Sequence, residues 1–385
     1  MRYPIMCYTA IATLLCTSAV VVSGQSSETA DEPLFPSAAN ERLATVIYVE
    51  GAPQLARNGE VVPNPVDFGF ELQDHDLLET GADGLVELSV YPRVGIAGRI
   101  TAQADTVLAF DMIAPEPSPT LRAEAEAVER RLHVFRGSVS VDLAGMSEGA
   151  AFTVQTPSVH VSVRGTDFTV DVALTGAIVV SSVEGVVELA VPGGRRLFAQ
   201  PGMVAYYRPA QELLRNVSVP GSRLSAFRRG RRANARAELR GNTEAVVQGL
   251  LREYRSARDE FSAAYAAVMT RRGILDAWVE AHRRRRGIPN EELRGQLGRI
   301  EEALADGITA LRRFESVFYR AEGVHELLGD NEGESYTALA QQLAADRELY
   351  RRRMRVLRYM RKLQNAAARA VYTDGNGVRS PGVAE

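Results

Sequence analysis

The chain has 385 residues, of which 45% are hydrophobic and 24% charged, with a net charge of −3, as in soluble globular proteins. This length suggests two or three domains, which can bury enough surface to be stable without disulfides. Both cysteines, Cys7 and Cys16, lie in an N-terminal apolar run, so the rest of the sequence excludes a disulfide framework, a cysteine zinc site and a cysteine nucleophile.

The first 24 residues have the pattern of a cleavable signal peptide. An apolar stretch covers residues 5–22, and the small residue Gly24 precedes Gln25. We therefore expect cleavage after Gly24 and a periplasmic or secreted protein. The alternative is an N-terminal anchor facing the periplasm, because about 18 apolar residues could just cross a bilayer. The polar, proline-containing residues 25–41 predict a flexible leader.

Residues 42–210 show a hydrophobic period of two. Short β-branched runs alternate with Gly, Asp, Asn and Pro, which predicts many short strands in an all-β domain. A sandwich, a roll and a β-solenoid all fit this pattern. A proline-rich and then Ala/Glu-rich stretch at 115–131 interrupts it, and we interpret this stretch as an inserted loop with one short helix.

The apolar phase changes once between residues 158 and 172. Apolar side chains occupy odd positions from 159 to 163 and even positions from 168 to 172. A shift of one residue moves every side chain to the other face of a sheet, so the chain must bulge or turn between these runs. Arg164, Gly165 and Thr166 stand at that point, and Arg164 could pair with Asp167 or Asp171.

The same segment resembles the signature of the FecR domain. The residues that carry the resemblance are Thr156, Pro157, Arg164, Gly165, Thr166 and Phe168, with weaker landmarks before and after them over under half of the chain. The best-known FecR proteins are membrane-spanning regulators with a cytoplasmic anti-sigma segment. Here the apolar run starts at residue 5, so the resemblance implies an extracytoplasmic, non-enzymatic interaction domain without anti-sigma signalling.

Residues 222–372 have a hydrophobic period near 3.5. Val247, Tyr254, Phe261, Val268 and Leu275 lie seven residues apart, which predicts one long coiled-coil-like helix ending near residue 287. Two further amphipathic helices follow, separated by a break near residues 329–333. Short connections predict an antiparallel helical bundle, which could also pair between copies of the chain. Residues 373–385, rich in Gly, Pro and polar side chains, predict a disordered tail.

The charge is divided between the two regions. Residues 1–220 carry 14 basic and 26 acidic side chains, and residues 221–385 carry 31 and 22. Either the basic half has an acidic partner or the two halves attract each other. The sharpest basic clusters are candidate contacts for phospholipid, lipopolysaccharide or a wall polymer: Arg283, Arg284, Arg285, Arg286, Arg351, Arg352 and Arg353. The alternative is that they are solvated ends of helices, since Lys362 is the only lysine in an arginine-rich chain.

No pattern in the sequence indicates catalysis. The five histidines lack metal-ligand spacing, neither a nucleophile elbow nor a phosphate-binding loop is present, and the run Asp74-His75-Asp76 reads as a turn. We therefore predict no catalytic, cofactor or metal site.

The predicted fold class is α+β, an all-β FecR-like domain followed by an all-α helical bundle. The predicted function is a non-catalytic interaction or scaffold protein of the cell envelope, in which the helices form a spacer or a partner-binding arm. Its partner would be an envelope protein or polymer, with peripheral membrane association possible. Export argues against a nucleic-acid partner. The alternatives are a membrane-anchored sensor in trans-envelope signalling and a wall- or glycan-acting enzyme.

Overall fold

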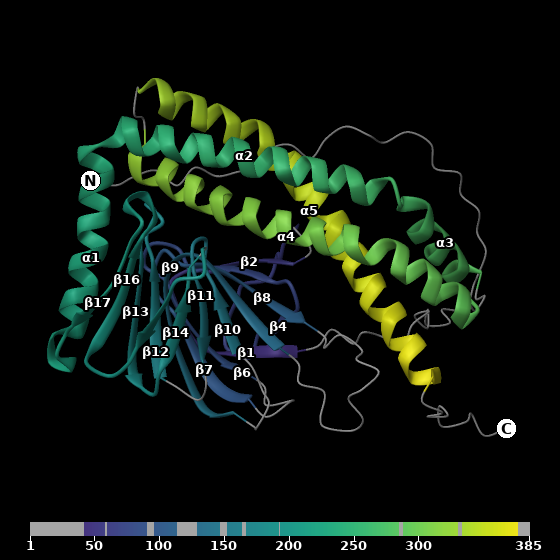
Figure 1. Cartoon of the computed structure of the whole chain (residues 1–385), viewed down its shortest axis with the longest axis horizontal. Helices are drawn as coiled ribbons and strands as arrows, with labels where there is room; N and C mark the ends of the chain where they lie inside the picture. The colour runs from purple at the N-terminus through teal and green to yellow at the C-terminus, as the bar shows by residue number, and fades with distance from the viewer. Residues whose placement is uncertain are drawn as a thin grey trace. The chain divides into compact units, whose positions relative to one another are not determined.

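The computed structural model describes residues 42–375, except 58–59, 91–95, 114–128, 147–151, 164–166, 192, 285–287 and 330–332. The predicted signal peptide, the leader and most of the predicted insert at 115–131 lie outside the described residues. Within them, 17 strands are followed by five α-helices, and one 3₁₀ turn (Pro209–Gln211) lies between the last two strands (Figure 1). This order confirms the predicted fold class, a β region followed by helices.

The strands form two sheets that share one long strand, β9 (Glu129–Met146). Sheet A also contains β1 (Arg42–Glu50), β4 (Glu71–Gln73), β6 (Leu85–Val90), β7 (Ile96–Ala102), β12 (Asp167–Val172), β13 (Ile178–Glu184), β16 (Met203–Arg208) and β17 (Leu213–Ser218). Sheet B also contains β2 (Gln54–Arg57), β3 (Glu60–Val61), β5 (Leu77–Glu79), β8 (Val107–Ile113), β10 (Phe152–Gln155), β11 (His160–Val163), β14 (Val187–Ala190) and β15 (Arg196–Ala199).

Strand pairing fixes the order within each sheet. Sheet A runs β4-β1-β6-β7-β9-β12-β13-β16-β17. Sheet B runs β3-β2-β5-β8-β9-β10-β11-β14-β15. Neighbouring strands are antiparallel except β9 and β10, which are parallel.

One hydrophobic core lies between the two sheets, so the β region is a sandwich, one of the three architectures predicted. Strand β9 contributes even-numbered Leu132 and Val134 from its sheet B half and odd-numbered Val139 and Val141 from its sheet A half. The parity changes at Gly137, which has a φ of 99°. A side chain there would overlap Thr106, so glycine lets one strand serve both sheets.

The phase change predicted near residue 165 falls between two strands that belong to different sheets. Strand β11 belongs to sheet B and β12 to sheet A, and both turn their apolar side chains into the shared core. The chain therefore changes sheets between β11 and β12. Residues 164–166 lie outside the described residues.

Five helices follow the sheets: α1 (Gly221–Gly241), α2 (Thr243–Met269), α3 (Arg272–Arg283), α4 (Asn290–Leu328) and α5 (Glu334–Gly375). On the outer face of sheet A, Tyr206 packs with Leu224 and Phe227 of α1. On the outer face of sheet B, Val107 and Phe135 join the core of the other helices. Both outer faces therefore carry helices (Figure 1), which explains why strands such as β13 are apolar on both sides.

Side-chain pairs give the helix directions. Glu260 of α2 pairs with Arg313 of α4, and Arg271, two residues past the end of α2, donates to the Arg299 carbonyl of α4. Residue numbers therefore fall along α2 as they rise along α4. Arg347 and Arg358 of α5 meet Glu322 and Glu315 of α4 in the same opposed order. Helix α4 therefore runs antiparallel to both α2 and α5.

Most of the large apolar side chains predicted at heptad positions lie in the helical core. Tyr254 and Phe261 of α2, Phe314 and Phe318 of α4 and Tyr350 of α5 are all at most 3% exposed. Their rings pack with centroids 4.8–5.5 Å apart. Aromatic pairs at such distances add stability beyond the area that they bury.

Several predicted boundaries were wrong. The first long helix is two helices, α2 and α3, separated by Thr270 and Arg271. Arg271, predicted at a seam position, donates from Nε to the Arg299 carbonyl. The β region continues past residue 210, since β17 pairs with β16 over six residues. Residues 129–131, assigned to the insert, begin β9, and residues 373–375, assigned to the tail, end α5.

Candidate interaction site

The first polar contact between helices and sheets joins α1 to sheet A. Arg228 donates from Nε to Asp171 Oδ2 at 2.6 Å and from Nη2 to Asp171 Oδ1 at 3.0 Å. The same Nη2 lies 2.9 Å from Ser138 Oγ. Asp171 and Ser138 are register partners on β12 and β9, so one guanidinium ties α1 to two strands. Asp171 is 3% exposed, and such a buried carboxylate requires a partner.

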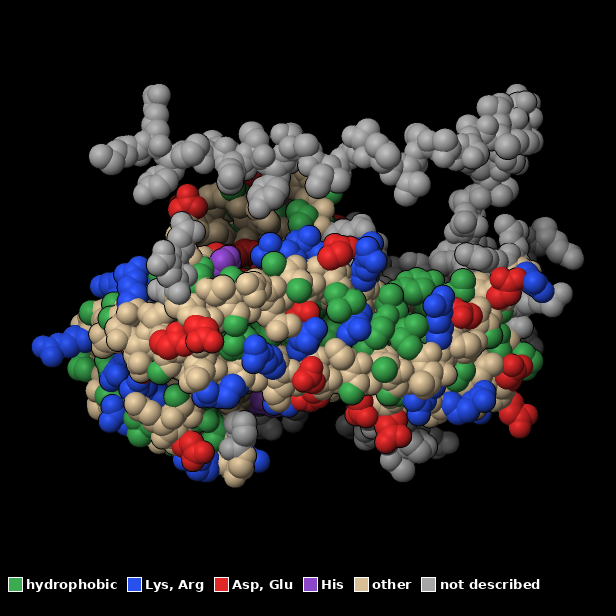
Figure 2. Space-filling model, turned by 90° about the horizontal axis from the view of Figure 1, so that it is seen from above, with side chains coloured by type: hydrophobic (Ala, Val, Ile, Leu, Met, Phe, Trp, Pro, Cys, Tyr) green, Lys and Arg blue, Asp and Glu red, His purple; other side chains and the backbone are tan. Residues whose placement is uncertain are grey.

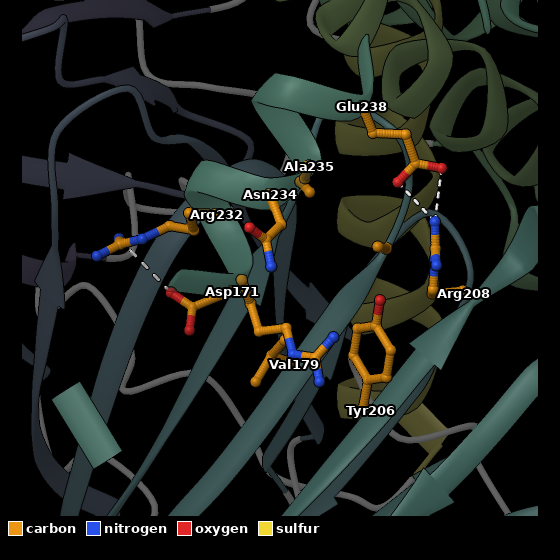
Figure 3. A pocket seen from close by; sticks show the side chains of 11 residues that line it. Asp171, Val179, Tyr206, Arg208, Arg232, Asn234, Ala235 and Glu238 are labelled. Atoms are coloured by element: carbon orange, nitrogen blue, oxygen red, sulfur yellow. Dashed lines mark hydrogen bonds and ion pairs between the residues drawn. The ribbon is translucent and has the colours of Figure 1, made fainter. Parts of the chain in front are cut away.

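Helix α1 carries further arginines that make similar contacts with the β region. Arg228, Arg232 and Arg236 are spaced by four residues and lie on one side of the helix. Arg232 Nη1 lies 3.6 Å from Asp171, and Arg236 Nη2 lies 2.7 Å from Asp105. Figure 3 shows the Arg232–Asp171 pair. Basic side chains of the helical half thus meet acidic side chains of the β region, as the hypothesis of mutual attraction requires.

The second contact joins α4 to sheet B. Arg136 of β9, 6% exposed, lies 2.6 Å from Glu79 of β5 and 2.8 Å from Glu326 of α4. Burial alone would lower the pKa of Arg136, but Glu326 and Glu79 outweigh it and raise that pKa. Gly323 of α4 makes room, since a Cβ there would overlap the guanidinium. Phe135 packs beside this pair on Tyr319 of α4, with centroids 5.2 Å apart.

The helical core contains a third group of charges. Glu315 of α4, 0% exposed, lies 2.6 Å from Arg312 and 3.1 Å from Arg358 of α5. Burial would raise the pKa of Glu315, but the two arginines hold it below its usual value. Asp346 of α5 pairs likewise with Arg258 of α2 at 2.9 Å. These carboxylates link helices to one another.

Beside the second contact, a cavity of about 180 Å³ lies between sheet B and helices α4 and α5. Its lining includes Glu322, Glu326, Arg347 and Arg351. Burial raises the pKa of Glu322 although Arg347, 3.0 Å away, opposes the shift.

The described residues of the FecR-like motif lie in a turn and in the core. Thr156 closes the turn between β10 and β11: its Oγ1 accepts from Val159 N at 3.0 Å and donates to Val159 O at 2.9 Å. Pro157 occupies the same turn, and Phe168 is 0% exposed in the sandwich core. Arg164, Gly165 and Thr166 lie outside the described residues. Asp171, which we considered as a partner for Arg164, pairs with Arg228.

The predicted basic clusters do not act as single groups in the described residues. Arg351 lines the cavity near Glu322, Arg352 pairs with Glu348 at 3.0 Å, and Arg353 donates to Ser262 Oγ at 2.9 Å and stacks on Tyr265. Arg284 pairs with Glu280 at 2.6 Å. Arg283 ends α3, whereas Arg285 and Arg286 lie outside the described residues. On the face seen in Figure 2, basic and acidic side chains are interspersed.

The run Asp74-His75-Asp76 forms a strained turn, with His75 at a φ of 65°. Asp76 is 0% exposed and accepts from Arg57 Nη2 at 2.7 Å. His75 Nδ1 lies 3.1 Å from Arg312 Nη2 of α4. The run therefore adds a further contact between the sandwich and α4.

Sequence reasoning missed the contacts of Arg228 and Arg136. No clear signal existed, because the alternation of apolar Phe168, Val170 and Val172 predicts that Asp171 lies on the polar, solvent-facing side of its strand. The sequence did not indicate which arginine would pair with it, since Arg228 lies 57 positions later.

No three His, Cys, Asp or Glu side chains among the described residues are grouped so that they could hold a metal ion. In the same part of the chain, each helix is too short or too polar to cross a membrane.

A comparison with family models agrees with the motif analysis. Residues 100–188 match the family model described as FecR protein. No curated protein matches the chain. Two solved structures, both described as a "putative anti-sigma factor" from Parabacteroides distasonis, share 16% and 20% identity with TM-scores of 0.29 and 0.26. They align over 39% and 37% of this chain, which spans 63% and 64% of theirs. The FecR resemblance predicted from the motif is thus confirmed for residues 100–188, from β7 to β14.

Proposed function

We propose that this protein is a non-catalytic interaction or scaffold protein of the cell envelope. The FecR match supports a signalling or regulatory role. In this proposal the sandwich and the helices together present a preformed surface to an envelope protein or polymer.

The pairing of the buried carboxylates carries the proposal. Asp171, Glu315 and Asp346 are at most 4% exposed, and an arginine from another helix or sheet binds each of them. A general acid or base must instead reach a substrate, with a pKa tuned near the working pH. Carboxylates held in this way stabilise contacts between layers, which is what a rigid binding platform requires.

The helical region is part of this platform in our proposal, and the predicted free spacer arm is revised accordingly. Its core includes Val107 and Phe135 of sheet B, and Arg136 and Asp171 pair with α4 and α1. Separating the helices would expose these apolar side chains and leave buried charges unpaired. Partner-binding experiments therefore need the full mature chain.

Photo-crosslinking in intact cells tests the proposal. A photoreactive residue replaces one exposed side chain at a time: Phe68 on the sandwich, or Leu349 or Tyr359 on α5, which are 75%, 41% and 54% exposed. The same residue at Leu311, 1% exposed, is the matched control. We expect a discrete adduct with an envelope component from at least one exposed position and none from Leu311. Absence of any adduct, together with turnover of wall or glycan substrates by the purified protein, would contradict the proposal.

Export is part of the same proposal. We propose that residues 1–24 direct export and are removed, so that the mature protein starts at Gln25. Sequencing the N-terminus of the protein from the periplasmic or secreted fraction tests this. A membrane-bound protein that keeps residues 5–22 would support the anchored sensor instead.

A further inference from the structure

A small cavity lies between α1 and the outer face of sheet A. Its volume is about 120 Å³, enough for several water molecules or for the charged end of a small ligand. Small side chains create the space, since Ala173, Ala177 and Ala235 face it. Figure 3 shows the charged pairs Asp171–Arg232 and Arg208–Glu238 around it, with Asn234 between them.

The lining carries three guanidinium groups and two carboxylates. Both carboxylates are occupied: Asp171 accepts from Arg228 and lies 3.6 Å from Arg232, and Glu238 accepts from Arg208 Nη2 at 2.5 and 2.6 Å. The cavity thus has a surplus positive charge.

Arg231 carries this surplus positive charge. Its guanidinium carbon lies 4.7 Å from the ring centroid of Tyr206 and 5.0 Å from that of Phe227. No carboxylate among the described residues pairs with it. Stacking on aromatic rings holds a guanidinium in place while leaving the N–H groups in its plane free to donate. A planar fork of N–H donors binds carboxylate and phosphate groups, often through two hydrogen bonds.

We propose that this cavity binds a small oxyanion, the carboxylate or phosphate group of a low-molecular-weight ligand, with Arg231 as its principal donor. Arg232 and Asn234 stand at the same cavity and can add donors. The proposal goes beyond the envelope-interaction function and is independent of it, because a scaffold could bind its partner without any small ligand. Since α1 forms one wall, the bound oxyanion would also strengthen the attachment of α1 to sheet A.

Isothermal titration calorimetry at low ionic strength tests the proposal, with succinate and inorganic phosphate as probes of the two chemistries. Arg231→Gln is compared with Arg229→Gln, which removes the same charge from an exposed position of α1 outside the cavity lining. We expect wild type to bind at least one probe, Arg231→Gln to bind it about tenfold more weakly or worse, and Arg229→Gln to bind it within about twofold of wild type.

A second variant separates loss of charge from loss of space. Ala177→Leu fills the cavity and keeps Arg231, so we expect it also to abolish binding. If Arg231→Gln loosens α1, Ala177→Leu shows whether the cavity itself is the binding site. Binding of succinate alone, of phosphate alone or of both would support the site and identify the chemistry. Failure of wild type to bind either probe would overturn the proposal, and so would equal weakening by Arg229→Gln and Arg231→Gln.

Discussion

The Arg228–Asp171 pair gives the sharpest test of how α1 is held. Arg228→Met removes the charge but keeps an apolar side chain of similar length. It leaves Asp171, whose side chain is 4% exposed, without its main partner. Removing one partner of a buried pair costs roughly 3–5 kcal/mol. Arg232 remains 3.6 Å from Asp171, and Arg228 itself is 16% exposed, so we expect a somewhat smaller loss than this, about 2–3 kcal/mol.

The matched control lies two turns further along the same helix. Arg236 and Asp105 form a pair of nearly equal length, 2.7 Å against 2.6 Å, but their side chains are 55% and 43% exposed. Exposed pairs contribute about 0–1 kcal/mol, so Arg236→Met should be nearly neutral.

Hydrogen exchange followed by mass spectrometry measures the protection of the α1 amides directly. A loss of 2 kcal/mol corresponds to protection of the α1 amides that is lower by a factor on the order of 30. We expect this fall in Arg228→Met and a fall of less than about fivefold in Arg236→Met. Equal losses in the two variants would refute the argument that burial of Asp171 makes its pair important.

Two further predictions concern α4. Gly323→Ala places a Cβ against Arg136 and 2.6 Å from Leu174 Cδ2, so urea unfolding should show a loss of about 1–3 kcal/mol. Gly298→Ala on the same helix meets nothing within 4 Å and should gain about 0.5–1 kcal/mol; the reverse order would mean that α4 does not pack on sheet B as described. Glu315→Gln should destabilise the protein most at neutral pH, because the pKa of Glu315 is lowered in the folded state and its carboxylate stabilises the fold above the ordinary pKa of 4.5. The deficit should shrink as the pH falls through the lowered pKa, and a deficit that grows on acidification would contradict the pairing with Arg312 and Arg358.

The sequence predicted those parts of the fold that depend on local periodicity. The alternation of apolar residues placed the β region, and the heptad positions Tyr254, Phe261 and Phe318 are buried as expected. The change of phase between residues 163 and 168 correctly marked a discontinuity, because a shift of one residue reverses the face of a strand. The FecR-like motif was recognisable because its residues stand in one continuous segment, in which the described Thr156, Pro157 and Phe168 lie in a turn and in the core.

What the sequence could not predict is the contact between its two halves. Pairing of Arg136 with Glu326, or of Asp171 with Arg228, joins residues 190 and 57 positions apart. In a chain with so many arginines, the sequence offers several equivalent partners for each acid. The same limitation explains why Arg351, Arg352 and Arg353 looked like one cluster, although adjacent residues of a helix point in different directions.

Unfolding followed by two separate probes tests most directly whether the sandwich and helices form one platform. Trp278, the only tryptophan and 0% exposed, reports on the helical core through its fluorescence. Pulse-labelled hydrogen exchange of β12 and β13 reports on the sandwich at the same urea concentrations. Our account predicts one midpoint for both probes, as expected for a single cooperative unit. Loss of the Trp278 signal at a clearly lower urea concentration, with β12 and β13 still protected, would contradict it.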